Sequence, residues 1–224
     1  MLAKDPPEVV ELFERIAELL SRAVVFNGTI VRSAGTLYAS EDDFLSGHGA
    51  SERGGRWNRP GMLAVYGSLD ILTATHEAYQ NFIDAGFPLS AIRPRVMAAA
   101  KATLRVVFDL TELPNRRKIG FTQAELVEED WQGIQAGGEE SWTQAIARGC
   151  RTAGFEALIV PSARRRIGKN IVVFPTVCAL GAGWRPLPSR SYRLIRTRGP
   201  INMHFCRYCC LYNCFQDDNM NQVS

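Results

Sequence analysis

GGRWN, at residues 54–58, is the stretch of the chain that says most about its fold and its chemistry. Two glycines let a backbone approach a ligand closely or adopt left-handed geometry. Arg56 can bind a phosphate or pyrophosphate through paired hydrogen bonds. Trp57 can line a pocket, and Asn58 can stabilise a turn through its side-chain hydrogen bonds. A polar surface loop with a packed tryptophan would show the same residues, so both alternatives remain open at this point.

The segments next to this motif have strand and helix patterns. Residues 40–61 are rich in Ser, Gly, Asp, Arg and Asn and predict a long loop, and long loops within compact domains tend to be functional. Residues 62–66 predict a buried strand. After it, Ser68 is the predicted cap of a helix that runs to about residue 85 and ends at Gly86.

Further elements extend this mixed order in both directions. Asp5 is the predicted cap of an amphipathic helix over 8–22, whose apolar face must pack on the domain or on a partner chain. Strands and helices alternate without a regular βαβ rhythm, which favours an α+β fold over a doubly wound sheet. The other predicted elements are a strand over 24–31 broken by a turn at Asn27-Gly28, an extended segment over 95–110, a helix over 141–153, and strands over 157–160 and 170–174.

Two polar residues stand where elements can present them to a ligand. Glu77 lies in the predicted helix, among small neighbours that leave room either for a ligand or for close helix packing. Ser162 follows a strand end and precedes three arginines at 164–166, a pattern that suits an anion site or a solvated basic turn. No G-x-S-x-G sequence surrounds Ser162, so a hydrolase-type nucleophile is not indicated.

Charge and hydropathy exclude several classes of partner. The formal net charge is +3 over 224 residues, and no basic stripe interleaved with aromatics stands out, so we expect no direct nucleic-acid contact. No apolar run approaches twenty residues, which argues against a membrane span. The N-terminus lacks a signal-peptide pattern, and we therefore expect a cytoplasmic protein.

Cysteine is unevenly distributed, with Cys150 and Cys178 in the main body and four residues crowded into 206–214. A secreted disulfide scaffold would spread its cysteines through the fold, so a reducing cytoplasm is the simpler setting. Residues 185–224 form a Cys/Arg-rich tail that we expect to be poorly ordered. Its cysteines and His204 are residue types that ligate zinc. They do not form two well-separated pairs of ligands, as structural zinc sites do, and we expect no metal.

The order of these motifs closely resembles the core of the RES domain family, over about residues 25–180. The resemblance rests on residues quoted in chain order: Gly49-Ala50, Gly54-Gly55-Arg56-Trp57-Asn58, Gly61, Val65-Tyr66, Ser68, Glu77, then Ile159-Val160-Pro161-Ser162-Ala163-Arg164 and Asn170-Ile171-Val172-Val173-Phe174. The Arg32 segment resembles the opening strand of that family.

The resemblance implies a fold, a partner and an activity. The fold would be an ADP-ribosyltransferase-like split mixed β core with surrounding helices, with an N-terminal helical extension at 1–24, the RES domain at 25–184 and the tail at 185–224. RES domains are toxins of toxin–antitoxin pairs, usually with an Xre-type antitoxin, and they consume NAD. We expect NAD as a consumed substrate, no resident cofactor, and possible homo-oligomers.

Carried over by position, the functional residues of the family fall on Arg32, Arg56, Tyr66, Glu77 and Ser162. An aromatic residue often follows the first arginine in the family, and here that site is Ser33, which puts one stacking contact to nicotinamide in doubt.

The implied reaction breaks the ribose–nicotinamide bond and develops positive charge at the anomeric carbon. The resemblance makes Glu77 the group that stabilises this charge, the two arginines the pyrophosphate ligands, and Tyr66 and Ser162 contacts to the rings, riboses or carboxamide. Water, phosphate and a protein side chain all remain open as acceptors. Two alternatives are a protein ADP-ribosyltransferase of the same fold and a catalytically silent RES-like binding module.

Overall fold

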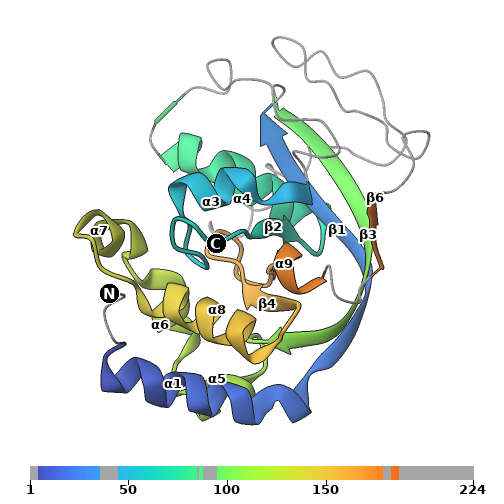
Figure 1. Ribbon diagram of the computed structural model, residues 1–224. Coiled ribbons are helices and arrows are strands. Elements are labelled where there is room, and N and C mark those ends of the chain that lie inside the picture. Colours follow the sequence, from blue (N-terminus) through green and yellow to red (C-terminus); the bar gives the residue numbers. More distant parts are fainter. Residues whose placement is uncertain (1–4, 36–44, 85, 88–94, 179–182, 187–224) are drawn as a thin grey trace, which may run out of the picture.

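The computed structural model describes residues 5–35, 45–84, 86–87, 95–178 and 183–186, and its centre is one mixed sheet (Figure 1). The strand order is β1-β2-β5-β4-β3-β6, and β1 also pairs with β3, so the first five strands of this order close into a small barrel. Only the β3–β4 pair is parallel among these pairings. The strands are β1 Val24–Gly35, β2 Val65–Ser68, β3 Arg95–Asp109, β4 Ala157–Pro161, β5 Lys169–Val173 and β6 Gly183–Pro186.

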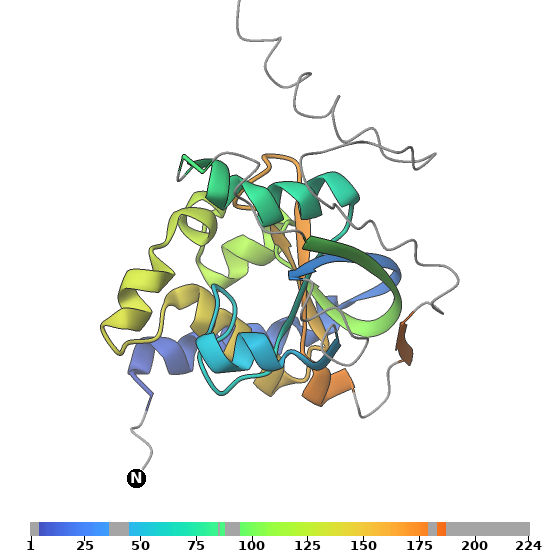
Figure 2. The same cartoon turned by 90° about the horizontal axis from the view of Figure 1, so that it is seen from above.

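Helices surround this sheet, and the predicted α+β class is confirmed. In both Figure 1 and Figure 2 the long, curved β1–β3 pair lies on one side of the molecule, and α6, α7 and α8 lie on the other. The helices are α1 Pro7–Glu18, α3 His48–Arg53, α4 Ile71–Asp84, α5 Leu113–Ile119, α6 Gln123–Glu128, α7 Trp131–Ala136, α8 Trp142–Ala153 and α9 Pro175–Cys178, with a 3₁₀ turn η1 at Leu19–Arg22.

The β1–β3 pair corrects one prediction. Asn27 and Gly28 do not form a turn, because they lie inside β1 opposite Thr103 and Ala102. The ladder instead runs on to the Gly35–Arg95 pair, with an irregularity between Val24 and Phe26. A long partner strand supplies backbone hydrogen bonds to every second residue of β1, and this outweighs the local turn preference of an Asn-Gly pair.

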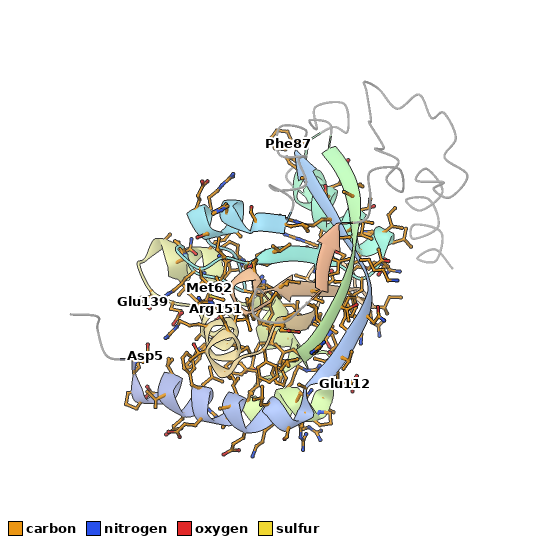
Figure 3. The ribbon with its side chains drawn as sticks, turned by 45° about the vertical axis from the view of Figure 1, so that its right-hand side comes forward. Asp5, Met62, Phe87, Glu112, Glu139 and Arg151 are labelled. Carbon is orange, nitrogen blue, oxygen red and sulfur yellow. The ribbon has the colours of Figure 1, made fainter. Side chains whose placement is uncertain are left out.

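The first helix packs on the domain. Leu12 and Ile16 are fully buried in the main hydrophobic cluster, between α1, α8 and the sheet. The close approach of α1 to α8 depends on Gly149, where a Cβ atom would lie 2.8 Å from the Phe13 ring and 2.9 Å from Ile16. Figure 3 shows side chains filling the space between α1 and the sheet.

The sequence predicted Asp5 as the cap of α1, and this prediction is wrong. Pro6 occupies the N-cap position without a side-chain hydrogen bond. The Asp5 carboxylate instead accepts hydrogen bonds from Arg148 Nη1 at 2.9 Å and Nη2 at 2.8 Å. The Arg148 guanidinium also binds Glu140 and lies 4.7 Å from the centre of the Phe13 ring. This ion cluster fixes the start of α1 to α8.

A second apolar cluster fills the other face of the strands. It contains residues from five strands, so it forms the interior of the barrel: Ile30, Val65, Ala102, Leu104, Val107, Ala157, Ile159, Ile171 and Val173. Side chains alternate between faces along a strand, so the intervening residues point to the helices or to the site described below.

The start of α4 also differs from the prediction. Ser68 is the last residue of β2, opposite Asn170 of β5, and its hydroxyl donates a hydrogen bond to the Asn170 side chain. Asp70 caps the helix instead, because its Oδ1 accepts from the Thr73 backbone N–H at 2.8 Å and its Oδ2 from the Thr73 hydroxyl at 2.7 Å. Strand pairing therefore delays the helix to Ile71.

Other predictions have mixed outcomes. The extended segment over 95–110, the helix over 141–153 and the strands over 157–160 and 170–174 are confirmed. The predicted loop over 40–61 contains α3, and its residues 40–44 lie outside the described residues. The tail beyond residue 186, with its cysteines, also lies outside them. In the described part of the chain, no helix is both long and apolar enough to span a bilayer.

Candidate active site

The site centres on the carboxylate of Glu77, which α4 places beside the end of β4 and the start of β5. Ser162 Oγ donates a hydrogen bond to Glu77 Oε1 at 2.6 Å. Asn170 Nδ2 donates to the same oxygen at 2.7 Å. We call Glu77, Ser162 and Asn170 the Glu77 cluster. Glu77 is 85 positions from Ser162 and 93 from Asn170, so tertiary structure joins two residues, Glu77 and Ser162, that the sequence singled out separately.

Ser162 is held by the turn that follows β4. Its Oγ accepts from the backbone N–H of Arg164 at 3.1 Å and of Arg165 at 3.0 Å, and its own N–H donates to Gly168. With these acceptor contacts made, its hydroxyl proton points to Glu77. The side chain is only 6% exposed, and its hydroxyl is committed to the protein. Ser162 therefore orients the carboxylate in this structure.

Arg165 ties the same turn to the start of α4. Its Nη1 donates to Thr73 Oγ1 at 3.2 Å and lies 3.4 Å from both carboxylate oxygens of Asp70. The basic run at 164–166 thus has at least one structural arginine, in contrast to a purely solvated basic turn.

Asn170 is a site residue to which the sequence analysis gave no role. Its Oδ1 accepts from Ser68 Oγ at 2.7 Å while its Nδ2 donates to Glu77. The signal was a polar residue near the start of a strand that is otherwise β-branched and buried. A polar residue at a strand end is common, and only the position of α4 gives this one a carboxylate partner.

A second group, the Tyr66 cluster, consists of Tyr66, Trp57 and Asn58. The Tyr66 hydroxyl donates to Asn58 Oδ1 and accepts from the Trp57 backbone N–H, both at 2.8 Å. Asn58 Nδ2 donates to the carbonyls of Ala50 and Met62. Burial raises the pKa of Tyr66, which therefore stays neutral. This cluster holds the motif loop against β2, and Trp57 itself is a buried core residue.

The glycines of the motif have a packing role. A Cβ atom at Gly55 would lie 2.7 Å from the Tyr66 hydroxyl oxygen and 3.0 Å from Asn58 Oδ1. Gly54 has a φ of 75° and leaves no room for a side chain beside Gln135. The loop thus approaches its own neighbours closely at both glycines.

Arg56 points from this loop toward α6. Its Nη1 donates to the carbonyls of Leu126 at 3.1 Å and Glu129 at 3.0 Å. Burial lowers the pKa of Arg56, and the charges of Glu129 and Glu77 partly offset this. Arg56 is therefore a half-buried cation within electrostatic range of Glu77, and part of its guanidinium already anchors the end of α6.

Arg32 has a different setting from the other predicted residues. A Cβ atom at Gly67 would point away from Tyr66 and Ser68 and would lie 3.8 Å from Arg32 Cγ. The stem of Arg32 therefore passes the opposite face of β2 from the Tyr66 and Ser68 side chains. Burial lowers the pKa of Arg32 to about 10, so it remains a cation at neutral pH. The hydrogen bonds of Glu77 come from Ser162 and Asn170 and do not involve Arg32.

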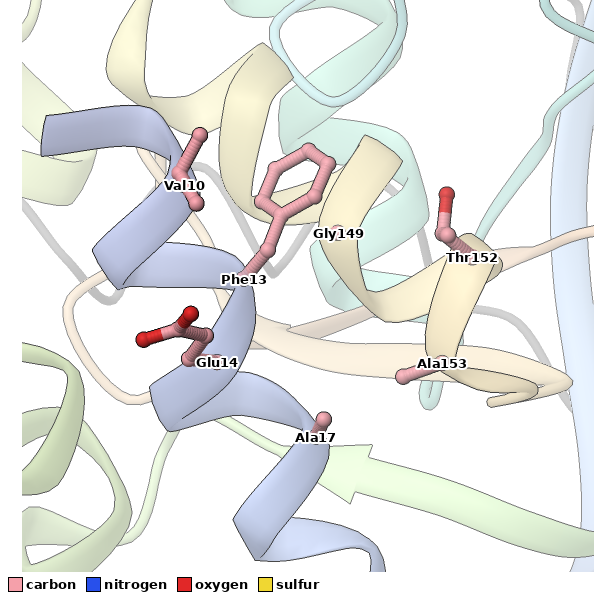
Figure 4. Close-up of a pocket in the computed structure, with 7 residues that line it drawn as sticks. All are labelled: Val10, Phe13, Glu14, Ala17, Gly149, Thr152 and Ala153. Atoms are coloured by element: carbon pink, nitrogen blue, oxygen red, sulfur yellow. The ribbon is translucent and has the colours of Figure 1, made fainter. Parts of the chain in front are cut away.

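The rest of the described chain has an apolar groove but no metal site. Among the described residues, no group of three His, Cys, Asp or Glu side chains is placed to hold a metal. An open, mostly apolar groove lies between α1 and α8, away from Glu77 (Figure 4). Its lining residues are Val10, Phe13, Glu14, Ala17, Gly149, Thr152 and Ala153.

Curated proteins with similar sequences carry enzyme names. The chain is 32% identical over 121 residues to "Probable NAD(+) phosphorylase Rv3189" of Mycobacterium tuberculosis, a match that covers 54% of this chain and 53% of that protein. It is 30% identical over 106 residues to NAD(+) phosphorylase MbcT of Mycobacterium bovis, covering 45% of this chain and 55% of that protein. The chain thus spans about half the length of the curated relatives it matches.

A family model and a solved structure match over longer stretches. The solved structure is a chain in the Mycobacterium tuberculosis MbcT–MbcA toxin–antitoxin complex, with a TM-score of 0.58 and 21% identity over 78% of this chain and 91% of that chain. At this identity the likeness concerns the fold. The family model, described as the RES domain, matches residues 29–194, which is most of the chain. The chain therefore belongs to the RES domain family.

Proposed function

We propose that this protein cleaves the bond between ribose and nicotinamide in NAD, with Glu77 as the catalytic carboxylate. The observation that carries the proposal is the arrangement of the Glu77 cluster, in which two neutral donors fix the carboxylate and a half-buried arginine lies nearby. A fixed negative charge stabilises positive charge that develops close to it, without reorganisation during the reaction.

The chemistry needs few groups. As the bond to nicotinamide breaks, its electron pair leaves with the ring nitrogen, and the anomeric carbon becomes an oxocarbenium-like centre. Nicotinamide leaves as a neutral molecule, so no strong general acid is required. Glu77 stabilises the cationic carbon, and Arg56 supplies positive charge for the pyrophosphate. The same role for Arg32, whose stem passes the other face of β2, rests on the family resemblance. Burial disfavours the charged form of both guanidinium groups, and an anionic ligand would stabilise that charged form.

For the acceptor we propose inorganic phosphate. The support is that the similar proteins are named NAD(+) phosphorylases. A phosphate oxygen bonds to the anomeric carbon, and the products are nicotinamide and ADP-ribose 1″-phosphate. Water as the acceptor would give ADP-ribose, and a protein side chain would give an ADP-ribosylated protein. NAD is the substrate in each case, and we expect no resident cofactor.

We further propose that the protein is a cytoplasmic toxin neutralised by an antitoxin of the Xre type, and that its barrel is of the ADP-ribosyltransferase-like kind. Support for a partner comes from the structural neighbour, which is a chain of a toxin–antitoxin complex. Expression of the active protein in a bacterial host should arrest growth, and co-expression of the cognate antitoxin should restore it. Normal growth with abundant active protein would contradict the toxin assignment.

The enzymatic proposal is tested by product analysis. Purified protein is incubated with NAD, with and without phosphate, and the products are separated by chromatography. Nicotinamide should appear together with ADP-ribose 1″-phosphate, and its rate of formation should depend on phosphate. ADP-ribose at a phosphate-independent rate would assign a glycohydrolase. Intact NAD under all conditions would refute the proposal and favour a silent binding module.

A further inference from the structure

Glu77 uses its two carboxylate oxygens differently. A carboxylate oxygen has two lone pairs, and Glu77 Oε1 accepts from both Ser162 and Asn170 at 2.6 and 2.7 Å. Oε1 is therefore saturated. Oε2 accepts no hydrogen bond from the residues that the structure describes, and the Glu77 side chain is only half-buried. A ligand hydroxyl can thus reach Glu77 only through Oε2.

A third residue, Ser68, keeps the Asn170 amide in place. Ser68 Oγ donates to Asn170 Oδ1 at 2.7 Å, so the amide oxygen faces Ser68 and the amide nitrogen faces Glu77. A flipped amide would place its oxygen against the carboxylate, which only accepts hydrogen bonds, so Glu77 selects the observed orientation and the Ser68 hydrogen bond keeps the amide in place. The Ser68–Asn170 strand pair fixes the spacing of these groups, because the two residues are opposite each other in β2 and β5.

We propose that Asn170 is a positioning residue that, together with Ser162, holds Oε1 of Glu77 so that Oε2 alone faces the nicotinamide ribose. The inference rests on the proposed function. Ser68 acts one step further away by fixing the Asn170 amide. The consequence is a single orientation of the catalytic carboxylate before substrate binds, which lowers the barrier without adding a contact to NAD.

The test compares kcat and KM of the full chain with NAD for the wild type, Asn170→Asp and Ser68→Ala. Aspartate at 170 keeps the shape and the acceptor for Ser68 but replaces the donor to Glu77 with a second carboxylate, so repulsion adds to the loss of the hydrogen bond. A hydrogen bond to a charged group contributes about 1.5–3 kcal/mol, so kcat should fall at least about 10-fold with KM changed less than about 3-fold. Ser68→Ala removes a neutral hydrogen bond and should reduce kcat about 2- to 10-fold.

Asn115→Asp is the matched control. Asn115 is also buried and donates through Nδ2, but to the Asp109 carbonyl at the start of α5. This control should lower the melting temperature and leave kcat per folded molecule unchanged. If Asn170→Asp does not fold, Ser68→Ala decides the question by the same split between kcat and KM.

The outcomes separate two failures. A wild type that leaves NAD intact overturns the proposed function and this inference together. An active wild type with kcat of Asn170→Asp or of a folded Ser68→Ala within about 2-fold of normal overturns only the inference, since this is below the loss expected for a missing hydrogen bond. If KM rises while kcat stays normal, Asn170 is a substrate contact, and this result would also overturn the inference.

Discussion

The Glu77 cluster and the Tyr66 cluster are both built from residues of the family motifs, yet they differ in what they leave available. The Tyr66 hydroxyl both donates and accepts within the protein, and Trp57 and Asn58 are buried around it. In the Glu77 cluster the donors converge on one oxygen of a half-buried carboxylate. A motif residue whose hydrogen-bonding capacity is used up supports the fold, and one with spare capacity can act on a ligand.

The largest effect should come from Glu77→Gln. Glutamine keeps an oxygen for Ser162 and Asn170 but removes the negative charge. Loss of one preorganised electrostatic contact should reduce the rate of NAD cleavage about 100- to 1,000-fold, measured as nicotinamide release. The free energy of unfolding, from urea titration, should change by less than about 1 kcal/mol, as expected where one hydrogen-bonding partner replaces another. Near-normal cleavage would remove the distinction between the two clusters.

Gly55→Ala should have the largest effect on stability. The new methyl group would lie 2.7 Å from the Tyr66 hydroxyl oxygen, so the motif loop would have to move. Overpacking of this kind should cost about 1–3 kcal/mol in urea unfolding. Gly49→Ala is the control, since a Cβ atom there meets nothing within 4 Å. Equal stability of both variants would show that the Tyr66 cluster is loosely packed.

Tyr66→Phe tests the role of the hydroxyl. The variant leaves the Trp57 N–H and Asn58 Oδ1 without their partner, which should cost about 1–3 kcal/mol of unfolding free energy. NAD cleavage per folded molecule should stay within about 3-fold of the wild type, below the effect of a lost charge-assisted contact. Strong loss of cleavage with normal stability would instead make Tyr66 a ligand contact, as the family resemblance implies.

The smallest effect concerns the Asp5–Arg148 pair, which lies outside both clusters and serves as a reference. The hydrogen bond from Arg148 lowers the pKa of Asp5, so the pair stabilises the fold above the ordinary pKa of 3.8 and loses this contribution as the pH falls through the lower folded-state value. The Asp5 side chain is 38% exposed, so Asp5→Asn should cost under about 1 kcal/mol at pH 7. The difference between the melting temperatures of the two proteins should vanish in acid. A difference that does not shrink as the pH falls below 3.8 would rule out the ion pair as its origin.

Much of the fold could be predicted from local patterns. The helix over 141–153 has the Ser141 capping box and ends at Gly154 with a φ of 98°, both of which are local signals. The strands over 157–160 and 170–174 are short apolar runs between turn residues. The predictions at Asn27-Gly28 and at Ser68 were wrong because strand partners more than thirty residues away overrode the local preferences. The boundaries at residues 24 and 184 remain predictions.

The site could be predicted only in part. Glu77 and Ser162 were singled out by position and by resemblance, and the structure joins them by a hydrogen bond. Of the two alternatives for the glycines, Gly54 has a positive φ of 75°, and the close approaches at Gly55 and Gly54 are to Tyr66 and Gln135. Asn170 received no role because an amide near a strand end has no chemical meaning until its neighbour is known. The assignment of all five predicted site residues to NAD stays a prediction.

By itself the sequence determined the family, the α+β class and the residue types available for chemistry, because these depend on the order of motifs and on local periodicity. Tertiary structure alone decided which lone pairs remain available. The pairing of β2 with β5 and the packing of α4 against these strands saturate Oε1 of Glu77, and the fold of the loop over residues 54–58 onto β2 occupies the hydroxyl of Tyr66. Hydrogen-bond saturation depends on distances between residues that are up to 93 positions apart in the chain, and no local pattern encodes these.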